Sequence, residues 1–283
     1  MQDCFHQRVF YYWRHGLIGH VILMCENATY SRNNDLFVHI WHALALGFSN
    51  QTAESLEELS YMTGRNDLST TYLACQYIVQ RHVSQNDSPQ LLQLHDEILE
   101  KIPKCNAFSA STSILVAIMF NNISFAKELF NLSEQHSEVL SMGGWIELIE
   151  GNLDLSNEYF DKALQDSYHS LDIYSLYGKA LYYTQIKELD EALSYYSTIL
   201  AHYDFPEIYF EKSRTYFYHH IFDNIDEIPN DAIYKLISPI ELYIFRALTC
   251  LIHKSNLKLA ADCLLRLTSE LDQYEPMNYD LYY

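Results

Sequence analysis

Apolar residues recur at spacings of three and four along most of the chain, a period that predicts amphipathic helices. In the segment 36–48, Ile40, Leu44 and Phe48 share one broad apolar face. The segment 51–62 that follows turns its leucines to one side and its glutamates to the other. The alternation that marks strands is almost absent, so we expect an all-α chain.

The pattern predicts about sixteen helices, with Asp35 and Ser88 as caps and Pro89 in a first turn. We also expect an acidic loop, 222–228, to be disordered. In chain order the expected helices are 5–15, 18–30, 36–48, 51–62, 68–83, 89–101, 111–120, 123–132, a pair in 137–170, a pair in 171–206, 207–220, a short one within 229–237, 238–253 and one from 257 onward.

The segments 137–170 and 171–206 are two copies of one pattern. Gly144 and Gly178 are 34 residues apart, which is the period of a tetratricopeptide repeat. With each glycine at position 8 of its repeat, small or aromatic residues fall at the other packing positions. They are Gly151, Ser156, Phe160 and Ala163 in the first copy, and Ala192 and Tyr196 in the second.

A glycine at position 8 lets the two helices of a repeat cross closely, and the aromatic residue at position 24 fills the space beside the crossing. One hairpin cannot bury its apolar face alone, so neighbouring hairpins must stack. An ordinary amphipathic helix pair could match the pattern by chance, but two tandem copies argue against that. We therefore expect 1–283 to form one α-solenoid of tetratricopeptide-like hairpins, wound as a right-handed superhelix.

Composition limits the partners. The chain has 18 Lys and Arg against 37 Asp and Glu, a formal net charge of −19. This charge would repel a phosphate backbone or an anionic membrane surface, and no apolar run is long enough to span a bilayer. We expect no nucleic-acid binding and no membrane insertion, but contacts with basic surfaces of other proteins. The six cysteines lie in apolar helical patterns, which favours reduced core thiols.

Candidate chemistry is sparse. His39 and His42 are three apart on one expected helix, but no carboxylate or cysteine stands at ligand spacing along the sequence, so a packed pair is favoured over a metal site. Phosphate-binding, nucleophile-elbow and zinc-protease motifs are absent from the sequence. We expect no catalytic residue, no cofactor and no metal, with an enzyme of hidden site as the remaining alternative.

A partner groove is the remaining route to function. In such repeats, positions 2, 5, 9, 12 and 13 of the first helix line the concave surface. They are Glu138, Ser141, Trp145, Leu148 and Ile149 in the first copy, and Asp172, Ser175, Lys179, Tyr182 and Tyr183 in the second.

From this set, the candidate groove residues are Trp145, Leu148, Ile149, Lys179, Tyr182 and Tyr183. A mainly apolar set with a single lysine favours a helix or an apolar segment over a peptide carboxylate. The alternative is that Trp145 and Leu148 pack on the next repeat.

Several short segments, taken in order, resemble the long tetratricopeptide subunit of the intraflagellar transport A complex. The resemblance covers nearly the whole chain, yet only the amino-terminal part of such a subunit. One departure is the spacing of 14 residues, rather than 12, between Gly178 and Ala192. The segments are Tyr11-Tyr12, 20–23, His42-Ala43, 53–59, 178–181, 210–212 and 260–276.

The resemblance implies a non-enzymatic subunit of a particle that carries cargo along ciliary microtubules, chiefly back from the tip. It implies other intraflagellar transport A subunits as partners, and a location in the cytoplasm and the cilium or flagellum, including basal body and axoneme. No individual side chain carries over as a site. The alternative is a general tetratricopeptide adaptor or co-chaperone-type module outside cilia.

Overall fold

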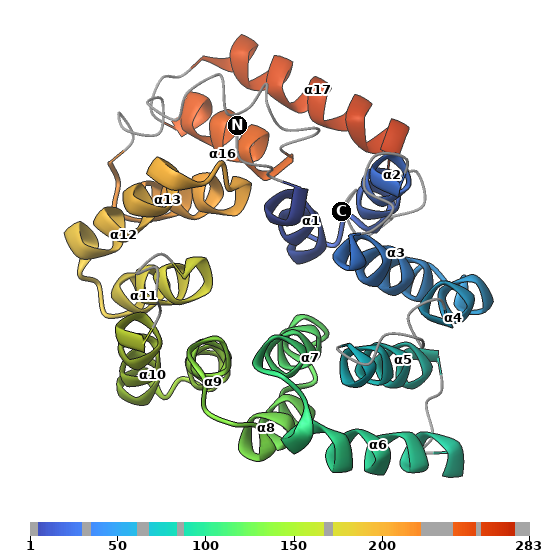
Figure 1. Cartoon of the computed structure of the whole chain (residues 1–283). Coiled ribbons are helices and arrows are strands. Elements are labelled where there is room, and N and C mark those ends of the chain that lie inside the picture. Colours follow the sequence, from blue (N-terminus) through green and yellow to red (C-terminus); the bar gives the residue numbers. More distant parts are fainter. Residues whose placement is uncertain are drawn as a thin grey trace. The chain divides into compact units, whose positions relative to one another are not determined.

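The computed structural model of the chain describes residues 5–29, 35–60, 68–83, 88–166, 172–221, 240–252 and 256–274. These residues form fifteen α-helices and one short 3-10 helix, Ile102–Lys104, without a strand among them (Figure 1). The prediction of an all-α chain is confirmed. None of the described helices is long and apolar enough to cross a membrane.

The chain divides into two compact units. The first comprises Val21–Ile186, and the second combines Met1–His20 with Lys187–Tyr283. The helix α2 (Ile18–Thr29) spans the boundary between them.

Two layers of helices build the unit Val21–Ile186. In one layer each helix packs against the next, and in the other each helix pairs with the helix that precedes it in the chain. This is the stack of hairpins that the repeat pattern predicts. The first layer is α3 (Leu36–Phe48), α5 (Ser69–Val83), α7 (Ala107–Met119), α9 (Ser137–Glu150) and α11 (Ile173–Gln185), and the second is α4 (Thr52–Ser60), α6 (Pro89–Lys101), α8 (Ile123–Leu132) and α10 (Leu153–Asp166).

A buried serine joins the helices of two hairpins in the same way. The Ser156 hydroxyl on α10 donates to the Gly144 carbonyl on α9 at 2.9 Å, and the Ser55 hydroxyl on α4 donates to the Ala43 carbonyl on α3 at 2.6 Å. Both pairs are 12 residues apart. The α3–α4 hairpin therefore repeats the crossing of α9–α10, with Ala43 in the place of Gly144.

Side-chain caps fix several helix starts. Asp35 accepts from the Phe37 amide and Ser88 from the Leu91 amide, which confirms both predicted caps. Asn106 caps α7 by accepting from the Ser109 amide at 2.7 Å. The prediction that this helix begins at 111 was therefore wrong, because a run of small polar residues hid its first turn.

In the other unit, α13 (Pro206–Tyr218) packs against α12 (Leu189–His202), α16 (Ile240–Ile252) and α1 (Phe5–Arg14), and α16 packs against α17 (Leu257–Tyr274). The rings of Phe10 and Phe205 meet edge-on with centroids 5.5 Å apart. The helix expected within 229–237 and the acidic loop 222–228 lie outside the described residues.

Candidate protein-binding site

The ring of Phe160 lies at the centre of the predicted repeat packing. It is fully buried, and a Cβ added at Gly144 would stand 2.5 Å from its Cε1. A Cβ added at Gly178 would overlap the same ring. Gly151 ends α9 in the left-handed conformation, with φ of 84°. The remaining predicted packing residues, Ser156, Ala163, Ala192 and Tyr196, are all fully buried.

Three of the candidate groove residues are buried and offer a partner little surface. The indole nitrogen of Trp145 donates to the Tyr174 carbonyl at 3.1 Å, and Leu148 is buried nearby on α9. The Lys179 ammonium donates to Asp161 at 2.6 Å and to Asn157 at 2.7 Å, both on α10. Lys179 thus ties two helices of the unit together instead of presenting its charge to a groove.

The other three candidates keep accessible surface. Ile149 is exposed, and Tyr182 and Tyr183 are half-buried with their rings edge-on to each other, centroids 5.1 Å apart. Lys179 also lies 5.4 Å from the Tyr183 ring centroid. Partner binding through these residues stays a prediction.

The structure places a cavity of about 200 Å³ among the first turns of the first layer. Phe37, Phe108, Glu138 and Tyr174 are the second residues of α3, α7, α9 and α11, and all four line it. The other lining residues are Ser111, Thr112, Leu115, Ser141, Met142 and Asp172.

Part of the lining of this cavity was predicted from the sequence. Glu138, Ser141 and Asp172 stand at the expected groove positions, whereas the apolar wall of Phe37, Phe108, Leu115 and Met142 was missed. The signal was present, because each aromatic residue follows directly on a helix start. Without the start of α7, however, Phe108 could not be placed on a helix.

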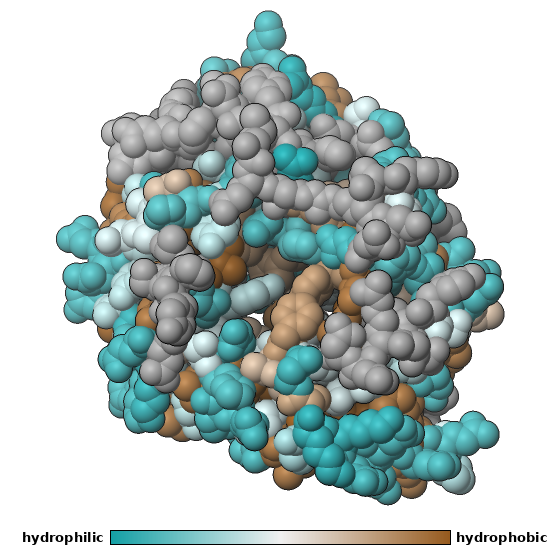
Figure 2. Space-filling view, viewed as in Figure 1, coloured by the Kyte–Doolittle hydropathy of each residue, from teal (hydrophilic) through white to brown (hydrophobic). Residues whose placement is uncertain are grey.

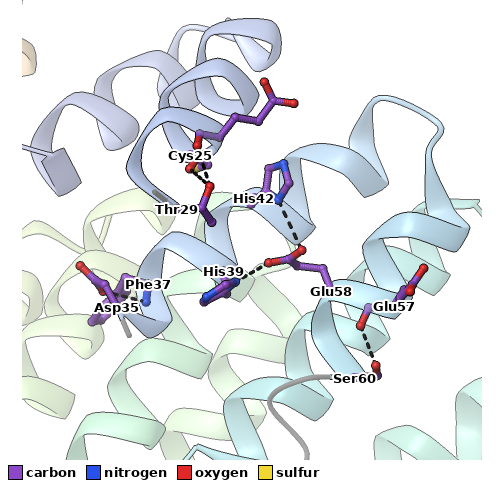
Figure 3. A network of polar contacts seen from close by, with 10 residues as sticks. Cys25, Thr29, Asp35, Phe37, His39, His42, Glu57, Glu58 and Ser60 are labelled. Carbon is purple, nitrogen blue, oxygen red and sulfur yellow. Dashed lines mark hydrogen bonds and ion pairs between the residues drawn. The ribbon is translucent and has the colours of Figure 1, made fainter. Parts of the chain in front are cut away.

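A carboxylate on α4 bridges the two histidines of α3 (Figure 3). Glu58 contacts the Nδ1 atom of His39 through one carboxylate oxygen, and its other oxygen lies 3.6 Å from the Nδ1 atom of His42. The nearby His42 imidazole contributes most to lowering the pKa of Glu58; burial opposes it, and the contact with His39 lowers the pKa further. The expectation that no carboxylate accompanies these histidines holds along the sequence but not in space, since Glu58 comes from the next helix.

Metal ligands and thiols are the other groups in this unit that could carry chemistry. Among the described residues, no group of three or more His, Cys, Asp or Glu side chains could hold a metal ion. Burial raises the pKa of the Cys25 thiol far above its ordinary value and that of Cys75 to about 12. These thiols therefore stay protonated and unreactive. Among the residues that Figure 2 colours by hydropathy, hydrophilic side chains predominate.

Residues 9–225 match the family described as Tetratricopeptide repeat protein 21 N-terminal ARM repeat. The chain belongs to this family of helical-repeat proteins. The match confirms the resemblance to the amino-terminal part of a tetratricopeptide subunit of the intraflagellar transport A complex. No curated protein matches the chain in a comparison of sequences.

Two solved structures of low sequence identity are similar to the chain. The chain is similar to the Cut9–Hcn1 hetero-tetramer of the APC/C, with a TM-score of 0.56 at 12% identity over 88% of this chain and 49% of that one. It is also similar to a tetratricopeptide repeat protein from Parabacteroides merdae, with a TM-score of 0.49 at 15% identity over 82% of this chain and 91% of that one. The first likeness supports the α-solenoid fold and nothing more.

Proposed function

We propose that the chain is a non-enzymatic scaffold subunit of the intraflagellar transport A complex, which supports retrograde ciliary transport through protein–protein contacts. The observation that carries this proposal is the family match over residues 9–225. A stack of hairpins suits such a role, because it offers a long surface to neighbouring subunits. Its partners would be other subunits of that complex, in the cytoplasm and in the cilium or flagellum, at the basal body and axoneme.

The accessible candidates Ile149, Tyr182 and Tyr183 are the residues we propose for one such contact. Aromatic side chains that are partly exposed contribute much of the binding energy at protein interfaces. Tyr182 and Tyr183 come from consecutive positions at the end of α11, with Ile149 at the end of α9.

The test is purification of the tagged chain from ciliated cells, with co-purifying proteins identified by mass spectrometry. Recovery of the other transport A subunits in stoichiometric amounts is expected. The double variant Tyr182→Ala, Tyr183→Ala should reduce that recovery, whereas Tyr218→Ala, at an exposed tyrosine of α13, should not. Recovery of chaperones or unrelated assemblies without ciliary subunits would instead favour the general adaptor function.

A further inference from the structure

The cavity between α3, α7, α9 and α11 contains a buried hydroxyl without a hydrogen-bond partner. Ser141 on α9 lines the cavity and is 1% exposed, and its Oγ atom makes no hydrogen bond with any described residue. Ser113 on α7 shows the usual alternative, since its hydroxyl donates to the Ser109 carbonyl at 2.7 Å. A buried polar group left unsatisfied is unfavourable. A bound group that accepts from Ser141 would remove this penalty.

The size of the cavity limits what can enter it. Its volume of about 200 Å³ lies below the roughly 300–1,000 Å³ of small-molecule and cofactor sites. Phe37 and Phe108 form one wall, with ring centroids 5.3 Å apart, and Leu115 and Met142 add apolar surface. These dimensions suit one large apolar side chain, which is how protein partners anchor themselves in pockets.

The charge at the rim favours cations. Glu138 is exposed and Asp172 is half-buried, and no lysine or arginine lines the described cavity. Helix N-termini by themselves favour anions. Here, however, Asp172 and Asn106 already accept from the first amides of α11 and α7. The Glu138 carboxylate accepts only from the exposed Ser137 hydroxyl, at 3.1 Å, among the described residues, so its negative charge can still face an incoming cation. The whole chain carries a formal charge of −19.

We propose that this cavity binds a segment of a partner protein in which one large apolar side chain is flanked by lysine or arginine. The apolar side chain enters between Phe37, Leu115 and Met142, a backbone carbonyl of the segment accepts from Ser141, and the flanking cation lies beside Glu138. The inference rests on the proposed function as a protein-binding scaffold, and it adds the chemistry of one docking site.

Methyl NMR of the whole chain, labelled at the methionine methyl groups, tests the proposal directly. Met142 lines the cavity, and Met24 and Met119 do not, so they serve as internal controls. The probe is the peptide Gly-Lys-Phe-Lys-Gly, with Gly-Lys-Ala-Lys-Gly and Gly-Glu-Phe-Glu-Gly as comparisons. Replacement of Met142 by Leu assigns its signal.

We expect the lysine–phenylalanine peptide to shift the Met142 signal in a saturable way and the other two peptides to bind several-fold more weakly. Glu138→Gln should weaken binding about two- to fivefold, as expected for one exposed charge pair. Glu158→Gln, on α10 and away from the cavity, should leave it unchanged. Ser111→Trp, which fills the cavity, should abolish the shift while helical content is retained.

Absence of a Met142 shift at millimolar peptide, or an equal shift with all three peptides, would overturn the proposal. Equal binding to the Glu138→Gln variant would overturn its charge component even if Ser111→Trp failed to fold. These outcomes are separate from the purification test. Loss of the ciliary partners would remove the ciliary function and leave the peptide result standing, and the reverse also holds.

Discussion

The Nε2 atom of His15 lies 2.8 Å from a carboxylate oxygen of Glu207, a residue 192 positions later in the chain. His15 directly follows α1, and Glu207 lies in the first turn of α13. Glu207 is fully buried, and Arg14 approaches its other oxygen at 3.5 Å. Two basic residues at the end of α1 therefore contact a buried carboxylate on α13, within the unit that combines Met1–His20 with Lys187–Tyr283.

Replacing His15 by alanine should destabilise this unit by about 2–4 kcal/mol, because Glu207 would stay buried with less compensation. Glu207→Gln should recover part of the loss, so a double-mutant cycle measured by urea denaturation should show coupling above about 1 kcal/mol. His136→Ala is the control, since this exposed histidine pairs only with exposed Glu134 in the described structure. Equal losses at the two histidines would contradict the assignment.

Glu211, one turn after Glu207, should make the stability of this unit depend on pH. Burial raises the pKa of its carboxyl to about 7, above the ordinary 4.5, and the charge of Glu207 adds to the increase although Arg214 opposes it. The folded state thus holds a proton that the unfolded state has released between these two values. This contribution to stability is complete below about pH 4.5 and is lost as pH rises through about 7.

This difference in the pKa of Glu211 between the folded and unfolded states changes the free energy of unfolding by an amount on the order of 3 kcal/mol. The Glu211→Gln variant lacks this titrating carboxyl. The stability of the variant relative to the wild type should therefore rise as the pH increases from about 5 to about 8. Denaturation curves at several pH values measure this difference. A constant difference across the range would mean that Glu211 titrates normally.

The positions of most helices follow from the local spacing of apolar residues, so the sequence predicts them well. Helices α3, α6 and α8 begin and end where the apolar period places them, since their caps and turns are local. The 34-residue spacing of Gly144 and Gly178 also predicts close contacts at two small residues, and both glycines face Phe160, Gly144 from α9 and Gly178 from α11, which packs on α10.

Contacts between residues far apart in the chain could not be predicted from the sequence. No pattern connects His15 with Glu207, and the α1–α13 contact follows from tertiary packing alone. Lys179 was predicted to line the groove because its repeat position lies on the concave surface, but its hydrogen bonds to Asp161 and Asn157 keep it buried. The cavity depends on four helix starts at once, and sequence reasoning missed one of them.

Lys179 should therefore act as a structural residue. Its side chain is 4% exposed, but that of its partner Asp161 is 46% exposed, so solvent screens part of the attraction. We expect Lys179→Ala to lower the free energy of unfolding by about 1–3 kcal/mol, and Lys179→Met to cost less because it keeps the packing. Lys162→Ala, which breaks an exposed pair with Glu158, is the matched control, with a much smaller expected effect because solvent screens that pair.

Glu58 should stabilise the α3–α4 hairpin at neutral pH. Its pKa is lowered below the ordinary 4.5, chiefly by the nearby His42 imidazole and then by the contact with His39, against the opposing effect of burial. A lowered folded-state pKa gives stability that is present above about pH 4.5 and lost as pH falls through the folded value. Glu58→Gln should therefore be less stable than the wild type at about pH 6, by about 1 kcal/mol, since the group is only half-buried. The two proteins should converge in acid, and a gap that persists there would show a loss of packing instead.

Gly178→Leu tests whether the two central repeats pack through Phe160. A Cβ at this position would already overlap the ring, and the ring is fully buried with no space to move into, so a leucine should force the hairpins apart. Even Gly178→Ala should cost about 1–3 kcal/mol, although alanine favours the helix by about 0.5–1 kcal/mol over glycine. Shortening the ring in the double variant Gly178→Ala, Phe160→Leu should restore part of that loss, which a general effect on helix propensity would not. Thermal denaturation with circular dichroism measures all three, and an unchanged melting temperature and helical content in Gly178→Leu would show that the repeat register assigned here is wrong.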